Sequence, residues 1–255
     1  MADGDPIIEL HDVGVRYRIP RERIPTFKEF AIKWLRGSVV YDELDALAGV
    51  SLRVGRGESV GIIGRNGAGK TTLMKVIARV LRPTAGTVRV GGKVAPLLEL
   101  GAGFDPELSG RENVFLNGAL LGRSRREMQR RFDAIVDFSE LGHFIDAPIR
   151  TYSTGMVARL GFAIATDVEP DILLVDEVLS VGDIEFQRKC AERIETILRR
   201  GTTLVLVSHS PESVLHLCTH AVWLAEGRVV ADGPAREVVD GFVARPTAHA
   251  LSATG

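Results

Sequence analysis

Gly64-Arg65-Asn66-Gly67-Ala68-Gly69-Lys70-Thr71 matches the pattern G-x-x-x-x-G-K-[ST], which is the strongest indication of the fold. An apolar, strand-like run ending at Ile63 precedes it, and a segment with helical character from Thr71 to Val80 follows. Glycines let successive backbone N–H groups turn inward toward phosphate oxygens, at a helix N-terminus whose dipole favours negative charge. The stretch therefore predicts a phosphate-binding loop between a strand and a helix.

The side chains of this loop have different expected roles. Lys70 is expected to reach the β- and γ-phosphates of a nucleotide, and the hydroxyl of Thr71 to ligate Mg²⁺. The remaining expected nucleotide contacts come from the same stretch and its continuation, at Gly64, Asn66, Gly67, Ala68, Gly69 and Thr72.

Polar residues follow two further apolar runs. Residues 172–175 are continuously apolar and lead directly into Asp176 and Glu177. A buried strand that ends in a carboxylate places it near Mg²⁺, so we expect Asp176 to be a metal ligand and Glu177 to be the general base for the attacking water. The next apolar run, 203–207, is followed by His209, which we expect to contact the γ-phosphate.

Composition excludes several classes of protein. The 255 residues include 32 basic and 33 acidic side chains, so no bulk positive charge attracts nucleic acid, and we expect none as partner. Cys190 and Cys218 are far apart and form no CxxC pair, which favours a reducing, cytoplasmic location over a disulfide framework or zinc site. The acidic N-terminus has no apolar signal region, and no run has the roughly 18 apolar residues of a membrane span. Any work at a membrane would be that of a peripheral subunit.

The order strand, helix, strand over residues 172–207 predicts a doubly wound α/β core. Gly14 is expected to divide residues 7–18 into two short strands, and a glycine turn at 55–57 to join two more. An arginine-rich helical segment around 116–141 indicates an inserted lobe. A hairpin over 221–231 and a helix over 235–243 complete the expected fold.

Residues 26–36 interrupt this order with a short amphipathic helix. Phe27, Phe30 and Trp34 follow helical spacing behind a capping-box pattern, and basic residues flank them. One hypothesis packs this helix on its own domain. The other places its aromatic face against a membrane-embedded partner or the membrane interface, with the basic residues near acidic headgroups.

Tyr152-Ser153-Thr154-Gly155-Met156 carries a resemblance to the ATP-binding-cassette family, where the corresponding segment is Leu-Ser-Gly-Gly-Gln. This sequence keeps the serine and the second glycine, upstream of Asp176, and has Ser180-Val-Gly-Asp183 where that family has Ser-Ala-Leu-Asp. The resemblance covers about residues 7–243. It implies that two copies pack head to tail, so that Ser153, Gly155 and Asp183 of one copy contact ATP held by the other.

The resemblance also implies the fold class and domain organisation. The expected fold is a P-loop NTPase of the cassette type with a RecA-like core, an N-terminal antiparallel β subdomain and an α-helical subdomain over about 95–167. Residues 1–246 would form this single nucleotide-binding domain, and residues 247–255 a loose tail.

Within that family, the signature, the segment 98–113 and the amphipathic insertion are similar to the ATPases of O-antigen, teichoic-acid and capsule-type polysaccharide exporters. Most cassettes have a glutamine in the loop that leads to the helical lobe. No glutamine occurs in 95–110, and Glu99 is the candidate for its role. About a dozen residues follow Val243, so we expect no C-terminal carbohydrate-recognition domain. An aromatic near the N-terminus stacks on adenine in the family, and Tyr17 and Tyr41 are the two candidates, Tyr17 being favoured.

Three hypotheses about function follow. The first is an exporter ATPase at the cytoplasmic face of the cell membrane, paired with a multi-span permease and moving a lipid-linked glycan. The second is a non-transport cassette, which usually needs a long coiled coil or two cassettes in one chain. The third is a P-loop kinase or GTPase, which would leave the segment around Ser153 without a role.

Overall fold

The structure is a computed structural model that describes residues 5–21, 41–97, 100–167, 170–176 and 182–244. Several sequence predictions lie outside these ranges: the amphipathic helix at 26–36, the tail at 247–255, Glu99 and Glu177.

A six-stranded sheet forms the core, in the order β5-β6-β7-β3-β8-β9. Its first five strands run parallel, and β9 pairs antiparallel with β8. The strands are β3 (Ser59–Ile63), β5 (Val94–Leu97), β6 (Ile172–Asp176), β7 (Thr203–Val207), β8 (His220–Ala225) and β9 (Arg228–Pro234). The predicted α/β core is thereby confirmed, and the carboxyl ends of its parallel strands lie along one edge.

Both faces of this sheet are buried, which explains the continuous apolar runs of β6 and β7. Alternate residues enter different clusters: Ile172 and Leu174 join one, and Leu173 and Val175 the other. The first cluster packs against the smaller sheet and α2 (Lys70–Ile77). The second packs against α6 (Ile184–Arg199) and α8 (Ala235–Ala244). Helix α7 (Pro211–Leu217) contacts β3.

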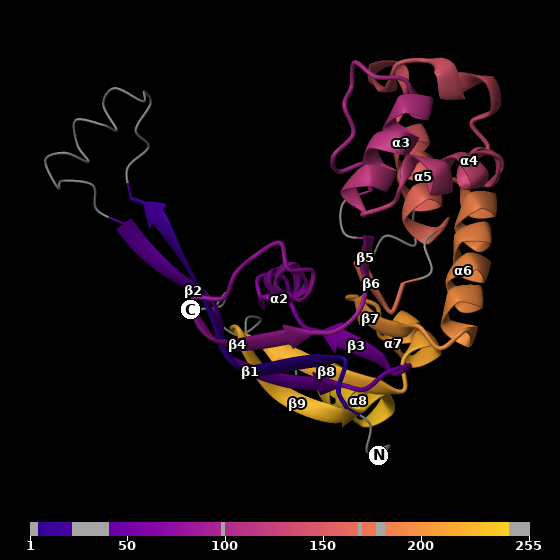
Figure 1. The fold of residues 1–255 in the computed structure, drawn as a ribbon. Coiled ribbons are helices and arrows are strands. Elements are labelled where there is room, and N and C mark those ends of the chain that lie inside the picture. Colours follow the sequence, from indigo (N-terminus) through magenta and orange to yellow (C-terminus); the bar gives the residue numbers. More distant parts are fainter. Residues whose placement is uncertain (1–4, 22–40, 98–99, 168–169, 177–181, 245–255) are drawn as a thin grey trace, which may run out of the picture.

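The smaller sheet has the order β2-β1-β4 and is antiparallel. Its strands are β1 (Ile8–Pro20), β2 (Tyr41–Val54) and β4 (Ala85–Val90). The expected break at Gly14 was wrong, because β1 continues through it with shifts in register on either side. The segments flanking the turn at 55–57 also do not pair: the first belongs to β2, and the second, β3, lies in the other sheet. Figure 1 shows β1 and β2 extending as a ribbon away from the core.

A helical lobe stands above one end of the core (Figure 1). It contains α3 (Gly110–Leu120), α4 (Arg125–Ser139) and α5 (Thr154–Asp167), with 3₁₀ turns at Gly142–Asp146 and Ile149–Thr151. Ser109 and Ser124 start α3 and α4 with complete capping boxes. The lobe has its own apolar cluster, including Val114, Phe132 and Leu160, so it has a hydrophobic core separate from the two clusters of the sheet.

Sequence patterns missed β4, β5 and α7 and extended the helix after the phosphate loop to Val80. In the structure α2 ends at Ile77, and Arg79 has a left-handed φ of 60° that stops the helix. Both cysteines are buried, and burial raises the pKa of each thiol to about 12, so neither is ionised near neutral pH. Within the described ranges, no helix has the length and apolar character to cross a membrane.

Candidate nucleotide-binding site

The phosphate loop connects β3 to α2, and three glycines set its shape. Gly64 and Gly69 pack against backbone: a Cβ on Gly64 would lie 2.3 Å from the carbonyl oxygen of Leu224, and one on Gly69 would lie 2.4 Å from that of Ala46. Gly67 has a left-handed φ of 80°, and a Cβ there would meet nothing within 4 Å. The loop therefore packs closely against the backbone at Gly64 and Gly69 and is open at Gly67. An open side is what the binding of phosphate oxygens requires.

Lys70 begins α2 and folds back over this loop. Its Nζ donates hydrogen bonds to the carbonyl oxygens of Gly64 at 2.8 Å and Arg65 at 3.0 Å. Burial lowers the pKa of Lys70, and the nearby Asp176 carboxylate partly opposes that change. Thr71 and Thr72 follow in the first turn of α2, where Thr71 is exposed. The ammonium group is thus held over the loop that would contain the phosphates.

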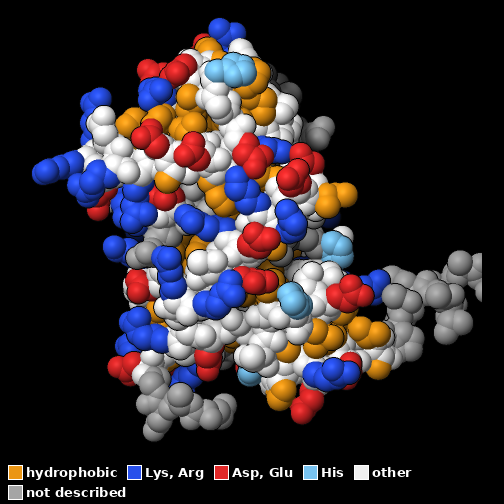
Figure 2. Space-filling view, turned by 90° about the vertical axis from the view of Figure 1, so that its right-hand side faces the viewer, with side chains coloured by type: hydrophobic (Ala, Val, Ile, Leu, Met, Phe, Trp, Pro, Cys, Tyr) orange, Lys and Arg blue, Asp and Glu red, His pale blue; other side chains and the backbone are white. Residues whose placement is uncertain are grey.

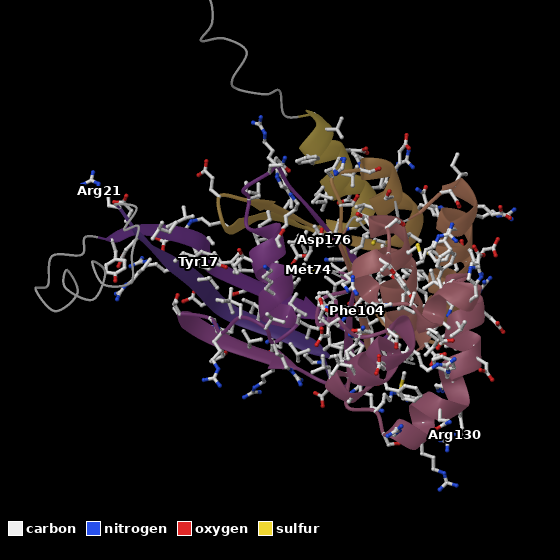
Figure 3. All side chains as sticks on the ribbon, turned by 90° about the horizontal axis from the view of Figure 1, so that it is seen from above. Tyr17, Arg21, Met74, Phe104, Arg130 and Asp176 are labelled. Atoms are coloured by element: carbon white, nitrogen blue, oxygen red, sulfur yellow. The ribbon has the colours of Figure 1, made fainter. Side chains whose placement is uncertain are left out.

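Asp176 is the last residue of β6, and it faces Lys70 across the carboxyl edge of the sheet. Strand β7 lies between β6 and β3, and Figure 3 shows Asp176 next to α2. Burial raises the pKa of Asp176, while the positive charge of Lys70 acts to lower it. For both groups burial is the larger effect, so each is shifted toward its neutral form despite their mutual attraction.

His209 comes two residues after β7, at the same edge of the sheet. Its side chain is exposed, whereas that of the preceding Ser208 is buried and accepts a hydrogen bond from the N–H of Ser210 at 3.0 Å. The structure therefore brings the phosphate loop, Asp176 and His209 to the ends of β3, β6 and β7. This is the grouping that the sequence predicted.

Tyr17 and Tyr41 lie on the same two-stranded ribbon. Tyr17 pairs with Leu44 across β1 and β2 and is half-buried against the first core cluster. Tyr41 begins β2 opposite Pro20 and is exposed. Figure 3 shows Tyr17 on the ribbon between the core and Arg21. Of the two candidates for stacking on adenine, Tyr17 is the one that packs onto the core that carries the phosphate loop.

Ser153 and Gly155 lie elsewhere, at the start of α5 in the helical lobe. The hydroxyl of Ser153 accepts a hydrogen bond from the N–H of Met156 at 3.2 Å and is exposed. Both residues line a cavity of about 360 Å³ together with Glu140, Leu141, Phe144, Met156, Arg159, Gly182 and Asp183. The residues described around this cavity include none from the phosphate loop. One chain thus has two separate groups of predicted site residues.

Asp183 has partners that its sequence position did not indicate. It is the N-cap of α6, where one carboxylate oxygen accepts the N–H of Phe186 at 3.0 Å. The other oxygen accepts a hydrogen bond from Arg159 at 2.7 Å. Sequence reasoning missed Arg159, and it also missed the carbonyl oxygens of Ala46 and Leu224 behind the loop. No sequence signal marks a backbone contact of this kind, because it depends on which strands become neighbours.

Residues 47–180 match the ABC transporter family. The O-antigen export system ATP-binding protein RfbB of Klebsiella pneumoniae is 51% identical over 195 residues, which cover 76% of this chain and 79% of that protein. RfbB of Myxococcus xanthus is 45% identical over 93% of this chain and 56% of its own length. The teichoic acids export ATP-binding protein TagH of Lactiplantibacillus plantarum is 41% identical over 92% of this chain and 64% of its own length.

Solved structures agree on the fold. An ATP-binding cassette in a dimeric post-hydrolysis state, bound to ADP and Pi, superposes with a TM-score of 0.70. The match covers 90% of this chain and 99% of that one at 23% identity. An ATP-binding subunit of an ABC transporter superposes with a TM-score of 0.72 over 94% of this chain.

Two alanine substitutions distinguish the effect of the loop's packing on stability from the effect of its open side on nucleotide binding. Gly67 and Gly69 both have left-handed φ, so both substitutions introduce backbone strain, but only a Cβ at 69 meets the Ala46 carbonyl. Gly69→Ala should therefore lower the free energy of unfolding by about 1–3 kcal/mol more than Gly67→Ala. Gly67→Ala should instead weaken nucleotide binding while the fold is retained. Urea unfolding and titration with a fluorescent ATP analogue measure the two effects, and equal destabilisation by both changes would contradict this packing argument.

Proposed function

The chain belongs to the ABC transporter family, and we propose that it is the ATP-hydrolysing subunit of an exporter for a lipid-linked polysaccharide. The observation that carries this proposal is the similarity to two kinds of export ATPase, one named for O-antigen and one for teichoic acids, over most of the chain. Both names refer to cell-surface polymers, so the shared property is the class of cargo. The particular glycan differs between these relatives.

The residues at the carboxyl edge of the sheet fit MgATP. The loop is open at Gly67, Lys70 lies over it, and the Asp176 carboxylate faces Lys70. In the proposed mechanism Lys70 binds the β- and γ-phosphates, Thr71 and Asp176 hold Mg²⁺, and His209 contacts the γ-phosphate. Glu177, which follows Asp176 in the sequence, removes a proton from the attacking water. Bound Mg²⁺ would neutralise phosphate charge in this site.

A second copy of the chain would complete each site. Ser153 and Gly155 lie in the lobe, apart from the phosphate loop of their own chain, and present an exposed hydroxyl and a helix N-terminus. In a head-to-tail dimer with two-fold symmetry, this group faces the loop of the partner, and two equivalent composite sites form. ATP then joins the two copies, and its hydrolysis separates them.

Complementation between inactive variants tests this arrangement. Lys70→Ala removes the loop cation, and Ser153→Arg blocks the surface offered to the partner. In an equal mixture half of the dimers are mixed, and each mixed dimer keeps one intact site, so ATPase activity should recover to about one quarter of the parent value. Mixing Lys70→Ala with Glu177→Gln is the matched control, because both changes disable the half that holds the nucleotide and no site is restored. Recovery in the control, or none in the first mixture, would contradict a shared site.

An apolar groove of about 330 Å³ between core and lobe is the proposed contact with the membrane-embedded permease. Val80, just beyond α2, and Leu120, at the end of α3, line it and are 72% and 66% exposed. The groove therefore offers exposed apolar surface to a short cytoplasmic helix of the partner. Bound in this way, the chain would be a peripheral subunit at the cytoplasmic face of the membrane.

Acidic residues introduced into this groove should prevent the chain from binding the permease. Val80→Glu with Leu120→Glu should abolish co-purification with a multi-span membrane protein, because two carboxylates would be buried in an apolar interface. The ATPase activity of the isolated chain should stay at the parent level. Leu215→Glu with Val230→Glu is the control, since these exposed apolar residues lie on α7 and β9. Normal co-purification of the groove variant would reject this docking site.

Depletion of the chain in its source organism tests the function itself. The expected result is loss of a surface polysaccharide and accumulation of the same polymer on its lipid carrier inside the cell. The parent chain should restore export, and Lys70→Ala should not, because it removes the cation of the phosphate loop. Unchanged surface polymer together with a defect in translation or DNA repair would support a non-transport cassette instead.

A further inference from the structure

Arg159 joins three helices beside the exposed Ser153 and the half-buried Gly155. From the middle of α5, its Nη1 donates to a carboxylate oxygen of Glu140 at 2.7 Å, and its Nη2 donates to Asp183 at 2.7 Å. The guanidinium also lies 4.6 Å from the centre of the Phe186 ring in α6. One side chain therefore connects the end of α4, the helix α5 and the start of α6.

The Asp183 end of this connection is held by two hydrogen bonds. Both oxygens of the Asp183 carboxylate are occupied, one by the N–H of Phe186 and the other by Arg159. Gly182 has a left-handed φ of 75°, and a Cβ there would lie 3.3–3.4 Å from atoms of Phe186 and Arg159. Residues 182 and 183 are thereby held against α5.

The Glu140 end of the connection is also held from two sides. Lys189 of α6 donates to Glu140 at 2.9 Å and to the carbonyl oxygen of Phe138 at 3.0 Å. These contacts, first with Lys189 and then with Arg159, lower the pKa of Glu140. Glu140 keeps a left-handed φ of 57° after the end of α4, a conformation that a non-glycine residue adopts only when its surroundings fix it.

Arg159 is more buried than Arg111, a second arginine of the lobe that contacts both a carboxylate and an aromatic ring. The side chain of Arg159 is 19% exposed and both of its carboxylate hydrogen bonds are short, while its partners Glu140 and Asp183 are 44% and 65% exposed. Arg111 makes a comparable set of contacts at the surface. It binds Asp146 at 2.6 Å and lies 4.4 Å from the Phe132 ring, but it is 46% exposed and touches only the lobe.

We propose that Arg159 is a positioning residue for ATP hydrolysis. It holds the start of α5, with Ser153 and Gly155, in a fixed place relative to residues 182–183, so that these groups and Asp183 are offered to the ATP of the partner as one surface. This inference rests on the composite site of the proposed function, in which Ser153 contacts the ATP of a second copy.

Steady-state kinetics of Arg159→Gln test the role. The ATPase kcat should fall roughly tenfold to hundredfold, as expected when catalytic groups are misplaced by about 1 Å. The dissociation constant for MgATP should change less than about twofold, because Arg159 does not contact the phosphate loop. Arg159→Lys should recover part of kcat, since an ammonium group keeps the charge but cannot span both carboxylates. Arg111→Gln is the matched control and should keep the parent kcat.

A double-variant cycle separates positioning from general loss of stability. Asp183→Asn preserves the helix cap and removes the charged acceptor, so it should lower kcat as well. If both residues act through one contact, Arg159→Gln combined with Asp183→Asn should be no slower than Arg159→Gln alone. A parent kcat in Arg159→Gln, an equal loss in Arg111→Gln, or additive losses in the double variant would each overturn the inference. If mixing Lys70→Ala with Ser153→Arg restored no ATPase activity, that result would instead reject the proposed dimer.

Discussion

The hydrogen-bond ladder that runs in parallel through β6, β7 and β3 is the constraint on which the candidate site depends. Because these strands share one direction, the phosphate loop, Asp176 and the segment containing His209 all leave the sheet at the same edge. The strands can stay in register only while both faces of the sheet are buried, and each face has its own apolar cluster. The intermixed acidic and basic side chains of the face in Figure 2 lie outside these clusters.

This arrangement places two charged groups where each is shifted toward its neutral form. Burial lowers the pKa of Lys70 and raises that of Asp176, although their charges attract each other. A site that holds phosphate and Mg²⁺ needs both groups charged, so the ligands that it would bind also offset its electrostatic strain. The close packing of Gly64 and Gly69 against neighbouring carbonyl oxygens keeps the loop in place meanwhile.

The lobe contributes the second group of predicted site residues, which includes Ser153 and Gly155. Specific polar contacts as well as apolar packing connect it to the core. Its own cluster lets it fold around Phe132 and Leu160, while Phe138 and Phe162 join the second cluster of the core. At this boundary Arg159 and Lys189 bind Glu140, and Arg159 also binds Asp183. A hydrogen bond between charged groups has a defined geometry, so these contacts add to the apolar packing in fixing the relative position of the two parts.

The sequence predicted the phosphate loop, the strand ending at Asp176 and the α/β core, because each has a local pattern of glycine spacing, continuous apolar runs or helix caps. It did not reveal that β1 continues through Gly14, or that the turn at 55–57 separates two sheets, since strand partners are chosen by distant residues. The contacts of Arg159 with Glu140 and Asp183 appeared only in the folded structure. Side chains far apart in sequence meet only after the sheet and the lobe have packed, and no local pattern specifies that packing.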